Sequence, residues 1–270
     1  MKKIGFIGIG NMGGAILAGY AQSENSKNVE LLAFDMNSEL CSSTKEKIPQ
    51  LELCSSGSEL CKIADTVIIG VKPQVIGGVL EEIAGSYDSS KTVISMAAGI
   101  SIEKVQRYLG DGAKIIRIMP NTPAKVGEAM VAMCRNDNVS DEIFDEATEI
   151  FAGIGRAEHI DESLIDCVIG VSGSSPAYTY MYIQALIEAA AANGMDEQKA
   201  RVFAAQSVLG AARMVLESSE SVEQLRINVC SPNGTTIEAV DRLFANGFMD
   251  DVKEGFQAAV DRSIEMGKEE

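Results

Sequence analysis

The sequence contains few of the residues that build metal sites. It has one histidine, His159, and its six cysteines form no Cys-x-x-Cys pair. Zinc sites need closely spaced cysteine and histidine ligands, so the sequence predicts no metal. A reaction that depends on a histidine base is also disfavoured, because a lone histidine is more simply a structural residue.

Basic residues are scarce as well. The chain has 23 lysines and arginines against 39 acidic residues, which leaves a formal net charge of −16. A field of this sign repels phosphate backbones and anionic lipid, so nucleic acid is excluded as an expected partner. A small anion can still bind where backbone N–H groups and helix N-termini create a local positive potential.

Neither a signal-peptide region after Met1 nor a membrane span is evident in the sequence. The longest uncharged stretch, 167–187, includes serines, a proline, a threonine and a glutamine, so we expect helices buried in protein there. We therefore expect no membrane partner and a cytoplasmic protein with reduced thiols.

Apolar β-branched runs alternate with helical patterns in the first part of the chain. This alternation is typical of βαβ units and predicts an α/β fold with a Rossmann-like, doubly wound parallel sheet. The predicted strands are 4–9, 30–34, 66–71, 92–95 and 114–118, and the predicted helices between them are 12–21, 74–84 and 102–109.

After residue 160 the pattern becomes helical, and no convincing strand follows. We expect two domains: a dinucleotide-binding domain over 1–160, and an all-α domain over 161–270 for substrate binding and dimerisation. The helical part has more apolar surface than one small bundle can bury, which favours a homo-oligomer. Its predicted helices are 189–192, 197–217, 237–245 and 252–266.

A glycine-rich loop joins the first predicted strand to the first helix. Gly8 permits a tight turn, Gly10 lets the backbone approach a pyrophosphate, and Gly13 allows close packing of the helix. Asn11 and Met12 open the helix, whose N-terminus would receive the phosphates. The alternative is a glycine-rich turn without a ligand.

Asp35 ends the second predicted strand, where a carboxylate usually accepts a hydrogen bond from the ribose 2′-OH of NAD. The alternative is an aspartate in a strand-to-helix turn, with Asn37 or Ser38 as the N-cap. The choice between NAD(H) and NADP(H) therefore stays open.

Several further segments, in order along nearly the whole chain, resemble the pyrroline-5-carboxylate reductase family. The last of them is the most specific, since glycine loops occur in many dehydrogenases. The segments are Val71-Lys72-Pro73-Gln74, Ser95-Met96-Ala97-Ala98-Gly99-Ile100, Ile118-Met119-Pro120-Asn121-Thr122-Pro123, Gly173-Ser174-Ser175-Pro176-Ala177-Tyr178 and Ser231-Pro232-Asn233-Gly234-Thr235-Thr236.

The resemblance implies an oxidoreductase that passes a hydride from NADPH or NADH to the C=N bond of Δ1-pyrroline-5-carboxylate, giving L-proline in the last step of proline biosynthesis. Family members commonly have an asparagine near the position of Gly57, so a contact to the adenosine end is missing here or comes from Ser58. By resemblance, the cofactor is lined by Gly70, Val71, Lys72, Pro73, Met96, Ala97 and Ala98, and the substrate by Glu162, Asn228, Thr235 and Thr236.

The segment 231–236 directly precedes a predicted helix, whose N–H groups could bind the substrate carboxylate. Gly234 would permit close approach, and the Thr236 hydroxyl would hydrogen-bond the imine nitrogen as the catalytic group. The alternative is plain capping, because Thr235 with Glu238 has the spacing of a capping box. Both interpretations can hold together.

Two other functions compete. A β-hydroxyacid dehydrogenase-like enzyme would need a catalytic lysine early in the helical domain, but no lysine or arginine lies between Arg156 and Lys199. A dinucleotide-binding regulator without turnover would have no use for the Thr236 loop. The sequence therefore favours an imine reductase.

Overall fold

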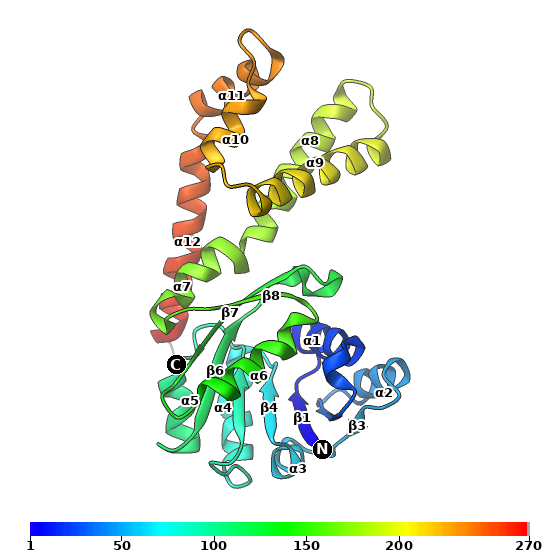
Figure 1. Cartoon of the computed structure of the whole chain (residues 1–270), viewed down its shortest axis with the longest axis vertical. Coiled ribbons are helices and arrows are strands. Elements are labelled where there is room, and N and C mark those ends of the chain that lie inside the picture. The colour runs from blue at the N-terminus through cyan, green and yellow to red at the C-terminus, as the bar shows by residue number, and fades with distance from the viewer. Residues whose placement is uncertain (269–270) are drawn as a thin grey trace. The chain divides into compact units, whose positions relative to one another are not determined.

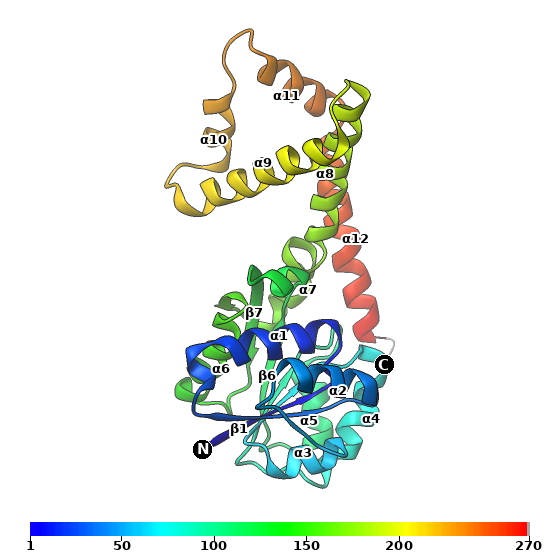
Figure 2. The ribbon, with the colours of Figure 1, turned by 90° about the vertical axis from the view of Figure 1, so that its right-hand side faces the viewer.

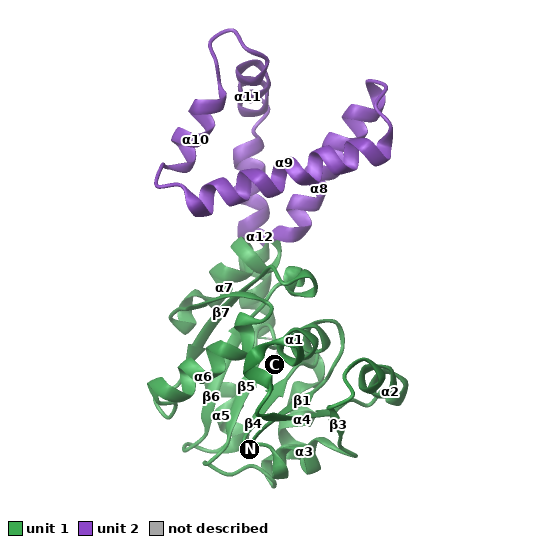
Figure 3. Ribbon diagram, turned by 45° about the vertical axis from the view of Figure 1, so that its right-hand side comes forward, with its two compact units in different colours: residues 1–174, 259–270 green, residues 175–258 purple. Residues whose placement is uncertain are grey.

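The computed structural model describes residues 1–268, and its contacts divide the chain into two compact units. The sheet unit comprises residues 1–174 together with the chain from Ala259 onward, and the helical unit is Ser175–Ala258 (Figure 3). This division differs from the boundary expected at residue 160. Ile165 is buried in the core of the sheet unit, and Ser263 is buried after the chain has returned to that unit, so both segments count with the sheet.

One eight-stranded sheet, ordered β3-β2-β1-β4-β5-β6-β7-β8, forms the centre of the sheet unit. All neighbouring strands are parallel except β6 and β7. The chain builds outward from β1 to β3 and then returns to the other side of β1 with β4, so the order reverses between β1 and β4. The strands are β1 Lys2–Ile7, β2 Val29–Phe34, β3 Glu52–Leu53, β4 Thr66–Ile69, β5 Thr92–Ser95, β6 Lys114–Met119, β7 Ala129–Arg135 and β8 Gly155–His159.

Helices connect the strands and make up the helical unit, which confirms the expected fold class (Figures 1 and 2). The short helical turns are η1 Glu24–Ser26, η2 Thr122–Val126, η3 Glu162–Leu164 and η4 Ile169–Gly173. The α-helices are α1 Asn11–Gln22, α2 Ser38–Lys47, α3 Gly57–Ile63, α4 Pro73–Ala84, α5 Ile102–Leu109, α6 Asp141–Ala152, α7 Ile165–Val168, α8 Ser175–Ala192, α9 Glu197–Glu217, α10 Val222–Val229, α11 Thr235–Ala245 and α12 Phe248–Lys268.

The sheet is covered on both faces, so its central strands are buried on both sides. Helices α1 and α6 cover one face of the sheet, and α3, α4 and α5 cover the other (Figure 1). Phe6 belongs to the buried cluster on the first face, and the next residue, Ile7, belongs to the cluster on the second. Successive side chains of a strand point to opposite faces, which is why strands in such a sheet are apolar throughout. The two buried clusters hold the strand ends in fixed positions.

The helical unit is different, because almost nothing in it is buried within one chain. Its only buried residues are Ala200 and Ala204, both in α9. The expected burial of 167–187 is therefore wrong for a single chain: Tyr180 is 60% exposed and Met181 70%. Most of the surface of these apolar side chains is therefore left uncovered within one chain. No helix among residues 1–268 has the length and apolarity to span a bilayer.

Candidate active site

The predicted cofactor residues lie at one edge of the sheet. β1, β2, β4 and β5 are parallel, so their carboxyl ends meet along this edge on both sides of the reversal between β1 and β4. Ligands of open α/β sheets bind at such a reversal. The structure brings to it Gly8, Gly10, Asn11, Met12 and Gly13 after β1, Asp35 after β2, Gly70, Val71, Lys72 and Pro73 after β4, and Met96, Ala97 and Ala98 after β5.

Three glycines allow the loops after β1 and β4 to touch. Gly8 has a φ of +86°, and a Cβ there would lie 2.7 Å from the Val71 side chain. A Cβ on Gly13 would lie 2.1 Å from the Gly8 carbonyl oxygen, and one on Gly70 would lie 2.6 Å from the same atom. Any side chain at these positions would push the first turn of α1 away from the sheet.

The N-terminus of α1 has no side chain capping it. Gly10 is the N-cap residue and provides no side-chain hydrogen bond, and a Cβ on Gly10 would meet no atom within 4 Å. The first N–H groups of a helix lack intrahelical partners and carry a partial positive charge. The open space beside Gly10, with the uncapped turn at Asn11 and Met12, fits a pyrophosphate.

Asp35 ties the glycine loop to the turn after β2. Its carboxylate accepts hydrogen bonds from the backbone N–H of Ile9 and of Asn37, both at 2.9 Å. Asn37 is the N-cap of α2 and accepts from the Leu40 N–H at 3.1 Å. The turn role expected for Asp35 is therefore present, and each oxygen keeps a further lone pair for a ribose hydroxyl. Ser58, the expected substitute contact, instead donates its hydroxyl to the Glu82 carbonyl at 2.8 Å.

The loops after β4 and β5 are held in place by their backbone conformation and hydrogen bonds. Lys72 is extended, with φ −65° and ψ 149°, because it precedes Pro73, the first residue of α4. The Met96 N–H donates to the Ile69 carbonyl at 3.3 Å, and Ala97 is buried.

Lys125 at this edge was not predicted from the sequence. It lies in η2, and its ammonium group donates to the Asn11 side-chain oxygen at 3.2 Å, beside the open end of α1. It forms no ion pair within residues 1–268. Because 114 residues separate Lys125 from Asn11, no local pattern reveals this contact.

Glu162 is held close to the loop after β5. Its Oε1 atom accepts from the Ile102 N–H at 2.8 Å, at the start of α5, and from the Arg117 guanidinium at 2.9 Å. Arg117 lies on β6, its side chain is 8% exposed, and sequence reasoning missed it. Burial raises the pKa of the neighbouring Cys134 thiol to about 12, with Glu162 adding to the effect and Arg117 opposing it.

Asn228, Gly234, Thr235 and Thr236 lie in the helical unit. Asn228, in α10, accepts from Gln224 at 2.8 Å and donates to the Glu220 carboxylate at 3.0 Å. These bonds fix the end of α10 just before the loop to α11.

Gly234 is the N-cap of α11, and a Cβ on it would lie 2.4 Å from the Ser231 hydroxyl. The capping box expected of Thr235 is wrong, because Thr235 is already the first helical residue and no side chain caps this helix. Thr236 is half-buried and its hydroxyl has no hydrogen bond within the described residues. The α11 N–H groups and this hydroxyl are thus free for a ligand.

His159 takes part in packing at the end of β8. Its Nε2 atom lies 2.9 Å from the Thr148 hydroxyl, and its ring centroid lies 4.1 Å from that of Phe144. The six cysteines are all free thiols. Residues 1–268 contain no cluster of side chains suited to hold a metal ion.

A doubly wound sheet with this glycine loop defines a dinucleotide-binding fold, and the match of its sheet unit to an NADP oxidoreductase family places the chain in the class of NAD(P)H-dependent oxidoreductases. Residues 3–99 match the family described as NADP oxidoreductase coenzyme F420-dependent, and residues 162–266 match pyrroline-5-carboxylate reductase dimerisation. The pyrroline-5-carboxylate reductase of Escherichia coli (strain K12) is 41% identical over 267 residues, covering 99% of both chains. The chain therefore belongs to the pyrroline-5-carboxylate reductase family.

Other relatives agree. The Methanosarcina acetivorans enzyme of the same name is 35% identical, covering 99% of this chain and 97% of its own. A Plasmodium falciparum pyrroline carboxylate reductase, solved with NADP bound, superposes with a TM-score of 0.86 at 33% identity and 98% coverage of both chains. A Streptococcus pyogenes enzyme gives 0.88 at 32% identity, covering 97% of this chain and 98% of its own. The expected family, reductase function and nicotinamide cofactor are confirmed, and the hydroxyacid dehydrogenase and regulator alternatives are set aside.

Proposed function

We propose that this chain reduces Δ1-pyrroline-5-carboxylate to L-proline, acting in the cytoplasm as a homodimer or a higher homo-oligomer through its C-terminal helices. The observation that carries the proposal is the uncapped N-terminus of α1 beside Gly10, which the close contact of Gly8, Gly13 and Gly70 holds in place. Relatives that match the chain over its full length are named pyrroline-5-carboxylate reductase. We also propose that residues 1–160 bind the dinucleotide and that residues 161–270 bind the substrate and form the dimer.

In this proposal the sheet edge binds the dinucleotide. The N–H groups of Asn11 and Met12 hold the pyrophosphate, and Lys125 adds positive charge next to them in a chain of net charge −16. Asp35 accepts a hydrogen bond from the adenosine ribose, and the loops 70–73 and 96–98 line the nicotinamide. The bound nicotinamide supplies the hydride.

The loop to α11 binds the substrate. The N–H groups of Thr235 and Thr236, together with Gly234, hold the carboxylate, since no side chain of the protein occupies that helix end. The Thr236 hydroxyl would hydrogen-bond the protonated imine nitrogen. That nitrogen already carries the proton that the product amine keeps, so addition of a hydride to the neighbouring carbon neutralises its positive charge. Asn228 keeps this loop in place, and Glu162 supports the region around the nicotinamide from the start of α5.

The reaction requires no histidine and no metal. A cyclic imine is already electrophilic, so the protein mainly positions two reactants and stabilises the nitrogen. To test the proposal, the consumption of NADPH and of NADH by purified protein is measured with and without the imine. The same assay gives the cofactor preference. If the imine causes no consumption of NADPH and none of NADH, the proposed function is wrong.

Thr236→Val tests the catalytic assignment directly. Valine keeps the shape and the helix start but removes the hydroxyl, so we expect kcat to fall by roughly tenfold to a hundredfold, the equivalent of about 1–3 kcal/mol for a lost buried hydrogen bond. The Kd of the reduced cofactor, measured by titration calorimetry, should not change. Thr44→Val, in α2 and far from both loops along the chain, is the matched control. Wild-type turnover in Thr236→Val would show that its hydroxyl does not act on the imine.

A further inference from the structure

The end of α12 approaches the loop that follows β5 closely, and both segments have a glycine where they meet. Gly99, with a φ of +75°, sits in this loop, and a Cβ on it would lie 3.2 Å from the Gly267 backbone nitrogen and 3.2 Å from the Met266 Cβ. In the other direction, a Cβ on Gly267 would lie 3.3 Å from the Gly99 carbonyl oxygen. Both positions lack a side chain where the two segments meet.

The loop is held only weakly by its own hydrogen bonds. Three backbone N–H groups of the loop donate bonds within the sheet edge, from Met96 to Ile69 at 3.3 Å, from Ala97 to the Ser95 hydroxyl at 3.5 Å and from Ile100 to Ala97 at 3.4 Å. All three are longer than the usual 2.9–3.0 Å. The position of the loop therefore depends on what packs against it.

Ala97 and Ile100 of the loop pack in the buried core of the sheet unit, and two contacts from outside the loop add to that support. Glu162 accepts from the Ile102 N–H at 2.8 Å where the loop enters α5. At the other contact, the α12 end is itself fixed: Ser263, the one buried residue of α12, donates its hydroxyl to the Asp166 carboxylate at 2.5 Å. Asp166 lies in α7, so α12 is anchored to the sheet unit one turn before it reaches Gly99.

We propose that the last turn of α12, through Gly267 on Gly99 and Ser263 on Asp166, is a positioning element that sets the loop 96–98 against the nicotinamide. This inference rests on the proposed function, in which that loop lines the cofactor. Gly267 and Ser263 touch neither reactant and act through the loop. Their effect should be the same for NADPH and NADH, because the loop lies away from Asp35, which follows β2.

Substitutions at Gly267 test the proposal, with Gly255 as the matched control. Gly255 lies in the same helix, and a Cβ there would meet no atom within 4 Å. We expect Gly267→Val to raise the Kd of both reduced cofactors by roughly tenfold, Gly267→Ala to raise it less, and Gly255→Ala and Gly255→Val to leave it unchanged. Titration calorimetry measures these constants without substrate, and thermal unfolding of each variant reports folding.

The outcomes separate positioning from plain packing. If Gly267→Val lowers the melting temperature but keeps the wild-type Kd, the contact is structural only and the proposal is wrong. Ser263→Ala, which keeps the helix but removes the bond to Asp166, should raise both Kd values several-fold, and no change there would also contradict it. If the Kd shifts occur but the wild-type protein reduces no imine, the proposed function fails while the positioning role stands; if the wild type binds neither cofactor, both are wrong.

Discussion

At the scale of single residues, Lys125 shows how one side chain can oppose the charge of the whole molecule. The ammonium group lies 3.2 Å from the Asn11 side-chain oxygen and forms no ion pair within the described part of the chain. Other exposed cations do form ion pairs, such as Arg107 with Glu103 one helical turn away. Lys125 is therefore free to compensate a bound anion.

Replacing Lys125 by glutamine keeps a hydrogen-bond donor near Asn11 and removes the charge. We expect the Kd of NADPH and of NADH to rise equally, by roughly fivefold or about 1 kcal/mol, since an exposed lysine interacts through water. The difference from wild type should shrink as salt is added, because ions screen exposed charges.

Lys47→Gln is the control for Lys125→Gln. Lys47 is an exposed lysine at the far end of α2, so its loss changes the net charge equally without touching the sheet edge. A rise in Kd for NADPH alone would place Lys125 at the 2′-phosphate instead, and no change would show that its charge does not reach the cofactor.

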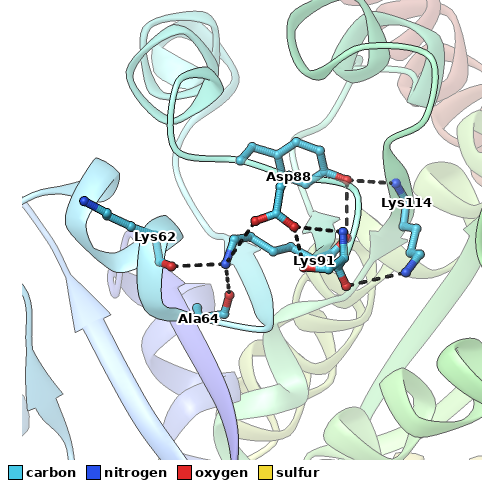
Figure 4. A network of polar contacts seen from close by, with 7 residues as sticks. Lys62, Ala64, Asp88, Lys91 and Lys114 are labelled. Carbon is cyan, nitrogen blue, oxygen red and sulfur yellow. Dashed lines mark hydrogen bonds and ion pairs between the residues drawn. The ribbon is translucent and has the colours of Figure 1, made fainter.

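At the scale of elements, the C-terminus of α3 depends on a buried lysine. Lys91 is 8% exposed, and its ammonium donates to the carbonyls of Lys62 at 3.2 Å and Ala64 at 2.9 Å, with Asp88 3.8 Å away (Figure 4). The last carbonyls of a helix lack intrahelical partners, and a cation there satisfies them.

Lys91→Met should therefore destabilise the sheet unit by roughly 1–3 kcal/mol, because two charge-assisted hydrogen bonds are lost where water has little access. Chemical denaturation of the full chain measures this change. Lys62→Met is the matched control. It removes an exposed lysine side chain but keeps the Lys62 backbone carbonyl that accepts from Lys91. Equal stability of the two variants would show that the Lys91 ammonium contributes nothing at α3.

Only some elements were predicted from the sequence to within a few residues. The apolar β7 and the amphipathic α6 were not predicted, and α8 was predicted only over 189–192. β5, α5 and α9 have the predicted bounds. α2 was missed because its sequence is polar and only Cys41 is buried in it, and β3 because it has two exposed residues. β8 was missed because Arg156, Glu158 and His159 give an edge strand no apolar alternation.

The site could be predicted only where it is local in sequence. The glycine loop and the loop before α11 each lie within a few consecutive residues, so their patterns are readable. The contacts of Lys125 with Asn11 and of Arg117 with Glu162 join residues 114 and 45 positions apart, and only the sheet topology brings them together. The capping box at Thr235 was wrong because Gly234 takes the N-cap position one residue earlier.

At the scale of the whole molecule, the helical unit has too small a core to be stable as one copy. Within residues 175–258 only Ala200 and Ala204 are buried, while Phe203 is 66% exposed and Leu216 73%. Exposed apolar surface of this extent marks an interaction face, and residues 162–266 match a dimerisation family. Burying these side chains against a second copy would supply the missing apolar contacts.

Phe203→Asp should therefore break the assembly. A charge at that position would have to be buried without a partner, so we expect a lower mass by light scattering and a lower melting temperature. Because the folded unit would depend on its partner, the wild-type melting temperature should rise with protein concentration, and that of Phe203→Asp should rise much less. Ile63→Asp is the control, since Ile63 is 42% exposed on α3 in the sheet unit and the same change there should leave the mass unaltered. If Phe203→Asp kept the wild-type mass and melting temperature, the exposed face of α9 would lie outside the interface, and the apolar side chains of α10, α11 and α12 would have to form it.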